Sequence, residues 1–324
     1  MPTAAADTLE LQLEDHRIEL TAYCYRMLGS GSEAEDAVQE TLTRAWRNHD
    51  RFEGRSSIRT WLYRIASNVC FDLLKASQRR AQPMDLAGPS TVDSPLGPRI
   101  EETRWVLPVP DGRVLSVGDP AEQAVARESI RLAFIAALQH LPPRQRAVLI
   151  LREVLRWEAS EVAELLDTTV VSVNSALQRA RATLAAKDLS PSDLSAKPLG
   201  VADRELLARY VDAFERYDMD SLTALLHEDA TQSMPPYELW LSGRTEILRW
   251  WTGPGHGCRG SRLVATAANG LPAFGQYRAS PDGGHEAWAL QLIEAVDGKI
   301  VELSFFLDTP HVFPLFGLPL RLDD

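Results

Sequence analysis

The sequence has few cysteines, and their spacing excludes two common kinds of small-domain scaffold. The three cysteines among 324 residues are Cys24, Cys70 and Cys258. They lie far apart, and none belongs to a C-x-x-C pair, which argues against a disulfide framework and against a zinc site. Cys70 adjoins the apolar side of a predicted helix, so we expect it to be a buried thiol.

Long apolar runs and nucleotide-binding motifs are also absent from the sequence. No apolar stretch approaches the roughly 20 residues that span a bilayer, and the acidic N-terminus MPTAAADTLELQLEDH lacks a signal pattern. We therefore expect a cytoplasmic protein without a membrane partner. Because no Gly-rich phosphate loop, metal-ligand cluster or nucleophile elbow appears, we predict no catalytic residue, cofactor or metal.

Positive charge is scarce overall, since the formal net charge is −11. The deficit is uneven, however. Residues 41–81 carry a net charge of +6 and residues 141–187 carry +2, whereas residues 1–40 carry −7 and residues 188–324 carry −9. Nucleic-acid affinity depends on local phosphate contacts, so the two basic stretches remain compatible with DNA binding. The length suggests two or three domains.

The chain is organised around residues 51–80, RFEGRSSIRTWLYRIASNVCFDLLKASQRR. Apolar residues recur at helical spacing from Ile58, which predicts an amphipathic helix of about five turns, capped by Ser56 or Ser57. Its inward stripe is Ile58, Trp61, Leu62, Ile65, Ala66, Val69 and Leu73. The polar face is Arg59, Tyr63, Arg64, Asn68, Phe71, Asp72 and Lys75. Such a face suits phosphates and stacked bases; a solvated face on an ordinary core helix is the alternative.

A second amphipathic helix is predicted over residues 34–47, AEDAVQETLTRAWR, with Ser32 as its cap and Trp46 on its inward stripe. A further helix over residues 9–28 precedes it, with Ile18 facing inward. The combination of DAVQETLTRAW with FEGRSSIRTWLYRIASNVCFDLL resembles the promoter-melting domain of bacterial extracytoplasmic-function sigma factors, over roughly residues 14–80.

The resemblance implies partners for this first domain, residues 1–80. In that family the first of the two helices binds the clamp of RNA polymerase, so Asp36, Gln39 and Glu40 are expected to face polymerase. The following loop and helix read the −10 element on the separated non-template strand. The residues expected to contact that strand are Phe52, Arg55, Ser56, Arg59 and Asn68. Trp61 lies on the apolar stripe, so we expect it to pack in the core.

Residues 81–120 hold seven prolines and four glycines, which predicts a linker. Its apolar stretch Trp105–Leu107 is expected either to dock on another surface or to pack on itself. A linker of this length would let two DNA-binding units sit well apart.

Residues 121–187 form a second predicted helical domain. Helices over 124–138 and 144–156 lead to a short helix over 160–166, a turn at Asp167-Thr168 and a longer helix capped by Thr169. This is the helix-turn-helix pattern, whose second helix enters the major groove; a plain helical hairpin is the alternative. The outward residues predicted to read DNA are Ser172, Asn174, Ser175, Gln178 and Arg179.

Because this stretch follows LPPRQRAVLILREV, it resembles the −35-reading domain of the same sigma family. It departs from the family at the turn, where members often have glycine in place of Asp167. It also has fewer basic residues, with Asn174 and Ala176 at positions where members carry cations. The departures predict a weaker grip on phosphates.

Beyond a polar hinge at residues 188–199, residues 200–324 predict an α+β domain. Helices over 203–218 and 221–227 precede the strand-like runs, and Asp297-Gly298 signals a hairpin turn between the last two. The predicted strands are 230–234, 237–241, 262–267, 273–278, 286–296 and 299–307. This order resembles the SnoaL-like cone fold, which some of these sigma factors carry as a tail.

Cone folds enclose a pocket, and a small hydrophobic ligand is its expected occupant. The residues that could line it are Met234, Trp240, Trp251, Tyr277 and Trp288, although ordinary core packing is the favoured interpretation of this aromatic set. In steroid-isomerase-type members a catalytic Asp precedes a Pro, and here Met234 stands in that place. A thioether cannot take a proton, so that general-base route is absent. The other candidate acids and bases are expected to be surface or packing residues: His227, His256, His285 and Asp308.

The sequence therefore predicts a multidomain protein: two all-α sigma domains, the second a helix-turn-helix, and a C-terminal α+β SnoaL-like cone. Its expected function is that of a sigma factor, not an enzyme. It would bind core RNA polymerase and promoter DNA at −35 and −10, and its own tail would modulate it. Two alternatives stay open. One is a ligand-responsive helix-turn-helix regulator. The other is a SnoaL-like isomerase or cyclase-type enzyme fused to a DNA-binding module.

Overall fold

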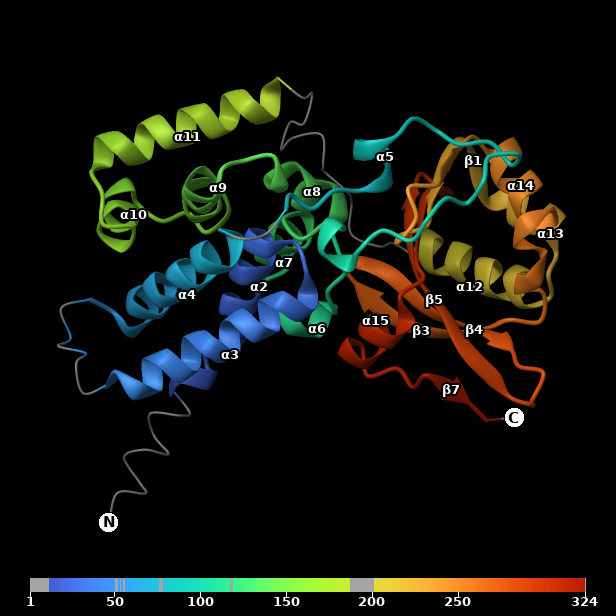
Figure 1. Ribbon diagram of the computed structural model, residues 1–324, viewed down its shortest axis with the longest axis horizontal. Coiled ribbons are helices and arrows are strands. Elements are labelled where there is room, and N and C mark those ends of the chain that lie inside the picture. The colour runs from blue at the N-terminus through green and yellow to red at the C-terminus, as the bar shows by residue number, and fades with distance from the viewer. Residues whose placement is uncertain are drawn as a thin grey trace, which may run out of the picture. The chain divides into compact units, whose positions relative to one another are not determined.

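The computed structural model describes residues 12–49, 52, 54, 56–75, 78–116, 119–186 and 201–323. These residues belong to two compact units. The helical unit combines residues 1–80 with 111–195, and the tail unit combines residues 81–110 with 196–324 and holds the β-sheet (Figure 1). Within the described residues, no helix is both long and apolar enough to cross a membrane. The predicted hinge at 188–199 lies outside the described residues.

Three helices make up the first half of the helical unit: α2 (Arg17–Leu28), α3 (Gly31–Arg47) and α4 (Ile58–Leu74). Ser30, not the predicted Ser32, caps α3 and accepts a hydrogen bond from the Glu33 N–H. Ser30 has this role because it is the last extended residue before the helix, whereas Ser32 lies inside it. Ser57 caps α4 as predicted, accepting from the Thr60 N–H at 3.1 Å.

Several side chains of this half differ from the predicted faces. Tyr63, predicted on the polar face of α4, is fully buried, and its hydroxyl donates to Glu19 at 3.2 Å. Trp46, predicted inward, is 57% exposed. The 17 residues of α3 outnumber the 12 of its neighbour α2, so its last turn extends past that helix. Ile18 and Leu73 were also predicted inward and are exposed.

The second half of the helical unit contains α7 (Pro120–Glu128), α8 (Leu132–Gln139), α9 (Pro143–Leu149), α10 (Ala159–Leu165) and α11 (Val170–Ala185). The turn between α10 and α11 holds Asp167 at φ 49°, a left-handed conformation that Asp tolerates better than most residues. Thr169 caps α11 as predicted and accepts from the Ser172 N–H at 3.2 Å. The predicted helix-turn-helix is therefore present.

Two predicted helices of this half are interrupted. The helix predicted over 124–138 breaks between α7 and α8, where the Ser129 hydroxyl donates to the Ala126 carbonyl at 2.7 Å. Such local bonds from serine compete with helix continuation. The helix predicted over 144–156 ends in a π-helical turn, Ile150–Val154, that follows α9 directly.

Two buried arginines join the two halves of the helical unit. Arg146 of α9 donates to the carbonyl of Met27 and to Gln139 Oε1, the latter at 2.7 Å. Arg26 of α2 donates to the hydroxyl of Ser129 at 2.6 Å. Burial lowers the pKa of each guanidinium to about 10, so both stay charged at neutral pH. Their oxygen partners compensate for the loss of hydration.

In its described residues the tail unit forms a seven-stranded sheet with the order β2-β1-β6-β5-β4-β3, and β7 pairs with β5. The strands are β1 (Leu226–Ser233), β2 (Trp240–Ser242), β3 (Arg262–Ala268), β4 (Leu271–Ala279), β5 (His285–Val296), β6 (Lys299–Phe306) and β7 (Arg321–Leu322). Strands β3 to β6 form an antiparallel meander, and β1 runs parallel to β6. The predicted hairpin is confirmed, with Asp297 and Gly298 at positive φ between β5 and β6.

Four helices of seven or more residues accompany this sheet: α12 (Val201–Glu215), α13 (Met219–Leu225), α14 (Arg244–Thr252) and α15 (Thr309–Leu315). The first two were predicted within three residues at each end. Helix α14 was not predicted; it turns Ile247, Trp250 and Trp251 into the core. Helix α15 was also not predicted, because Pro310 and Pro314 are atypical of a helix interior.

Residues 81–110 are not the free linker that their proline content predicted. Ser90 pairs with Leu241 of the edge strand β2, and Pro110 pairs with Ala268 at the end of the opposite edge strand β3. The stretch Trp105–Leu107 is buried. Proline removes backbone donors, and the helices of this segment are limited to the single turns α5 (Pro83–Leu86) and Glu102–Arg104, but a chain of this kind can still cover sheet edges. The linker prediction is wrong for this segment, which belongs to the tail unit.

Candidate functional sites

The residues predicted to face polymerase lie together on α3. Asp36, Gln39 and Glu40 are all exposed. Asp36 and Gln39 also line a polar hollow of about 330 Å³, together with residues of α2 and of α6 (Asp111–Val114). At this hollow Arg113 of α6 pairs with Glu35 at 3.2 Å. The surface presents carboxylates and an amide, which suits a basic or hydrogen-bonding partner.

The residues predicted to read the −10 element occupy different environments. Arg55 lies outside the described residues. Asn68 is exposed on α4, and Ser56 is half-buried just before it. Phe52 is half-buried and stacks on Trp61, with ring centres 4.9 Å apart. Trp61 is thus partly buried and supports the start of the loop.

Arg59 is held on three sides. Its Nε donates to the Glu19 carboxylate at 2.8 Å, and its guanidinium carbon lies 5.3 Å from the ring centre of Tyr63. The ring centre of Trp157 lies 5.0 Å away. Burial, the largest single cause, lowers the pKa of Arg59. The hydrogen bond to Glu19 and the nearby charges raise it, and their combined effect is larger, so the pKa of Arg59 is raised. Arg59 is therefore a cation with protein partners already in place.

Residues of the helix-turn-helix half cover this side of α4. Trp157, just before α10, packs on Tyr63 with ring centres 5.1 Å apart. Arg64 of α4 donates from Nη2 to the carbonyl of Glu164 at 2.9 Å and lies 3.9 Å from its carboxylate. The face of α4 that carries Arg59 and Arg64 is consequently packed against α10 and the residues before it.

The outward face of α11 is uncovered. Asn174, Gln178 and Arg179 are exposed. Of the other two predicted residues, Ser172 is exposed and Ser175 is half-buried. Within the described part of the chain Arg179 forms no ion pair, whereas Arg181 pairs with Glu153. The inward residues are buried as predicted: Val173, Leu177, Ala180 and Leu184.

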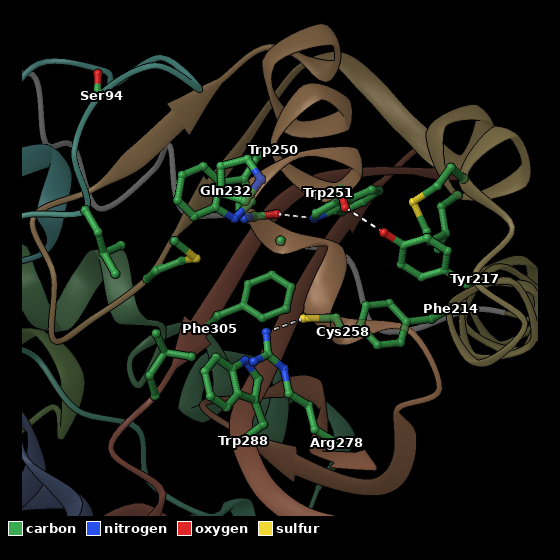
Figure 2. Close-up of a pocket in the computed structure, with 17 residues that line it drawn as sticks. Ser94, Phe214, Tyr217, Gln232, Trp250, Trp251, Cys258, Arg278, Trp288 and Phe305 are labelled. Carbon is green, nitrogen blue, oxygen red and sulfur yellow. Dashed lines mark hydrogen bonds between the residues drawn. The ribbon is translucent and has the colours of Figure 1, made fainter. Parts of the chain in front are cut away.

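The tail unit contains a cavity of about 450 Å³ with mostly apolar walls (Figure 2). Gln232, Trp250 and Trp251 lie on one side of it, and Phe305 and Trp288 lie on the other. The Trp251 indole N–H donates to Gln232 Oε1 at 2.8 Å, which fixes both side chains. This size and composition fall within the range of small-molecule sites.

Three of the five predicted pocket residues line the cavity: Met234, Trp251 and Trp288. The other two do not. The Trp240 indole N–H donates to the Ala87 carbonyl at 2.9 Å, so Trp240 anchors residues 81–110. Tyr277 is fully buried against Phe313 of α15, with ring centres 5.3 Å apart. Successive residues of a strand face opposite sides, so the next residue, Arg278, faces the cavity instead.

The candidate acids and bases of the tail lie elsewhere. His227 and His256 are exposed, and the Nδ1 of His256 contacts the Gly253 carbonyl at 2.9 Å. His285 is buried, with Nε2 3.2 Å from the Gly260 carbonyl. Asp308 pairs with Arg99 at 3.4 Å. None of these four lines the cavity, and Met234 does.

Three family models match the chain in the order of these sites. The model described as Sigma-70 region 2 matches residues 13–80, and Sigma-70 region 4 matches residues 131–184. The model described as SnoaL-like domain matches residues 207–303. Each match falls on an independently described part of the fold: α2 to α4, α8 to α11, and the sheet with its helices.

Curated relatives decide the family. The ECF RNA polymerase sigma factor SigG of Mycobacterium tuberculosis is 44% identical over 313 residues, covering 94% of this chain and 82% of SigG. This chain belongs to the extracytoplasmic-function sigma factors. SigJ of the same organism is 28% identical over 322 residues, and the pairing covers 96% of this chain and 94% of SigJ. The crystal structure of SigJ shares the fold, with a TM-score of 0.59 at 23% identity over 96% of this chain and 99% of that chain.

The sigma factor thus directs promoter recognition by RNA polymerase, with regions 2 and 4 followed by a SnoaL-like domain. Sequence patterns did not identify Glu19, Trp157 or Glu164 as partners of Arg59 and Arg64. These contacts join residues 40 to 100 positions apart, so no local spacing signals them. In the tail, the alternation of side chains along β4 could have indicated that Arg278, next to Tyr277, faces the cavity.

Proposed function

We propose that this sigma factor binds core RNA polymerase through Asp36, Gln39 and Glu40 in its region 2, residues 1–80. The loop before α4, with Phe52, Arg55 and Ser56, reads the −10 element together with Arg59 and Asn68 of α4. In region 4, residues 121–187, Ser172, Asn174, Ser175, Gln178 and Arg179 read the −35 element. The observation that carries the proposal is the exposed outward face of α11 on a capped helix-turn-helix.

The −10 site is proposed to work only after an opening step. Arg59 and Arg64 are engaged by Trp157 and Glu164 although their side chains remain 41% and 44% exposed, so DNA has to displace these contacts before it can use both guanidiniums fully. A cation–π contact contributes about 0.5–2 kcal/mol and a hydrogen bond about 1 kcal/mol. Opening therefore costs a few kcal/mol from these contacts, which binding to core polymerase has to offset. The free sigma factor is then a weak −10 binder.

The tail is proposed to modulate this step through residues 81–110. This segment links region 2 to region 4 in the chain, yet it belongs to the tail unit. Thirty residues reach roughly 100 Å when extended, whereas an attached segment has a fixed end-to-end distance. The Val92 N–H donates to Glu246 at 3.1 Å, and the Ser90 N–H donates to the Trp240 carbonyl at 2.7 Å. Release or retention of the segment would set how far regions 2 and 4 can separate.

A charge-reversal variant tests the polymerase assignment. Asp36→Arg with Glu40→Arg should abolish co-purification with core polymerase and run-off transcription, because two exposed carboxylates at the proposed interface change sign. The matched control is Glu228→Arg with Asp229→Arg, which reverses two exposed carboxylates of the tail. Unchanged co-purification of the folded region 2 variant would refute the assignment.

The enzyme alternative has less support than a binding role for the tail. Among the described residues, the side chains that line the cavity include no carboxylate and no imidazole. Met234 occupies the place of a general base, and its thioether cannot accept a proton at neutral pH. We infer that the cavity holds a ligand without transforming it, and assay of the purified protein for isomerisation of unsaturated ketones would test this.

A further inference from the structure

The tail cavity contains one charged side chain among those that line it, Arg278 of β4. The remaining lining residues are apolar, aromatic or neutral polar. Phe214, Trp250, Trp251 and Phe305, which form part of the wall, are each less than 10% exposed. A cation in such surroundings interacts more strongly with an anion than it would in water.

Arg278 is held in one plane and keeps unused donors. Its guanidinium carbon lies 3.3 Å from the ring centre of Trp288, and its Nη2 contacts the Cys258 Sγ at 3.2 Å, a weak acceptor (Figure 2). Its Nε is buried and has no hydrogen-bond partner. Within the described residues Arg278 forms no ion pair. The stacked indole fixes the guanidinium plane, so the free edge has a defined direction.

The buried arginines of the helical unit show what a structural role requires. Arg146 donates to oxygens of Met27, Gln139 and Leu141. Arg278 has a sulfur and an aromatic ring in place of such oxygens. Arg278 is half-buried, and a charge in apolar surroundings is normally paired, so its contacts with a sulfur and a ring leave room for an anion that the described residues do not supply.

We propose that the tail cavity binds an apolar monocarboxylic acid, with its carboxylate on Arg278 and its apolar body among Phe214, Trp250, Trp251 and Phe305. A planar guanidinium and a carboxylate form paired, charge-assisted hydrogen bonds. A neutral ligand would leave the charge of Arg278 without a counter-ion, since no described residue forms an ion pair with it. A phosphate dianion would bring a second charge for which the cavity has no cation. The cavity volume of about 450 Å³ admits molecules with bodies of one to three rings.

This ligand would also contact the segment that joins regions 2 and 4. Ser94 and Leu96 belong to residues 81–110 and line the same cavity. A ligand that touches both the segment and the tail binds more tightly when the segment is in place, and by linkage it holds the segment there. This part of the inference rests on the proposed role of the tail as a modulator.

The binding test uses the full-length protein without polymerase. The probes are 2-naphthoate, biphenyl-4-carboxylate and decanoate, each compared with its primary amide by thermal shift and by quenching of tryptophan fluorescence. At least one acid should bind and should exceed its amide by about tenfold or more, since a charge-assisted bond contributes about 1.5–3 kcal/mol. If no acid binds, or if the acid and the amide bind equally, the proposal is overturned.

Variants locate the site. Arg278→Gln should weaken the best acid by about tenfold to hundredfold and leave its amide within about twofold. Arg278→Lys should recover part of the loss, because a lysine keeps the charge but not the paired geometry. Arg262→Gln, which removes an exposed cation from β3, is the matched control and should change nothing. Equal acid affinity in Arg278→Gln and in the control would overturn the assignment.

The coupling to residues 81–110 has a separate readout. Amide hydrogen exchange in residues 90–96 should slow when the best acid is added and should stay unchanged in Arg278→Gln. Unchanged exchange on binding would overturn the coupling and leave the ligand site standing. Run-off transcription without ligand tests the sigma function itself, so a failure there is distinguishable from a failure of ligand binding.

Discussion

The two helices assigned to DNA differ in how they are held. On α11 the outward residues Asn174, Gln178 and Arg179 are exposed, as the proposed contact with the major groove of DNA requires. On α4 Arg59 already has protein partners, and Arg64 is bonded to Glu164. Double-stranded DNA at −35 needs no rearrangement of itself to be read, whereas the −10 strand must first be separated. The proposed −10 reader is partly covered and the proposed −35 reader is open, which fits that order of events.

The largest expected effect comes from removing Trp157, which packs on Arg59 and Tyr63 of α4. Trp157→Ala should lower the free energy of unfolding of the helical unit by about 3–5 kcal/mol, because a buried indole is lost from its contacts with Arg59 and Tyr63. It should also raise the affinity of the free sigma factor for single-stranded −10 oligonucleotide, measured by fluorescence anisotropy. Trp46→Ala, at an exposed tryptophan of α3, should do neither.

Because Trp157→Ala also weakens the core, a milder variant is needed beside it. Glu164→Lys places a cation near Arg64 without creating a cavity, since the Glu164 carboxylate is 62% exposed. It should raise −10 strand affinity with little change in the unfolding midpoint. Wild-type affinity in both variants would mean that the contacts of Trp157 and Glu164 with α4 do not restrict DNA access. In that case α4 and α11 would not differ in how readily they bind DNA.

A smaller effect is expected from the open helix. Arg179→Ala should weaken promoter binding by about 1–3 kcal/mol through the −35 element, because a free guanidinium that contacts a base edge is lost. Arg181→Ala, two residues on, removes a cation that Glu153 already holds, and should cost less than about 1 kcal/mol. A base-by-base promoter scan distinguishes the cases, and a change in −10 preference would show that the two regions had been assigned in reverse.

Local sequence patterns predicted the parts of this fold that local forces determine. The caps Ser57 and Thr169, the inward stripe of α11 and the Asp297-Gly298 turn depend on residues within a few positions of one another. The contacts of Trp157 and Glu164 with α4 join residues that are far apart in the chain. No periodicity encodes such contacts, so Arg59 was predicted only as part of the polar face of α4 and as a −10 contact.

Two errors in the tail have the same origin. The prolines of residues 81–110 predicted a linker, but whether such a segment docks depends on remote groups such as Glu246 and Trp240. Tyr277 was chosen for its ring, although the neighbouring Arg278 is the residue that faces the cavity. Choosing between strand faces requires the packing partner, here Phe313 of α15.

The smallest expected effect concerns the attachment of residues 81–110 and its dependence on pH. His311 of α15 lies 3.2 Å from Asp308 and 3.7 Å from Glu102 of that segment. The hydrogen bond to Asp308 raises the pKa of His311, with the charges of Asp308 and Glu102 adding to the effect.

A raised pKa of His311 means that the folded state favours the protonated ring. The stabilisation is therefore complete below the unfolded pKa near 6.5 and is lost as pH rises through the folded value. Because His311 is mostly exposed, the contribution should stay below about 1 kcal/mol.

The urea midpoint of wild type should exceed that of His311→Gln at pH 5.5 and approach it at pH 8.5, while His256→Gln, at an exposed histidine outside this cluster, should show no such convergence. A constant difference between wild type and His311→Gln across this range would show that the imidazolium does not hold Glu102 and that residues 81–110 stay attached by other contacts.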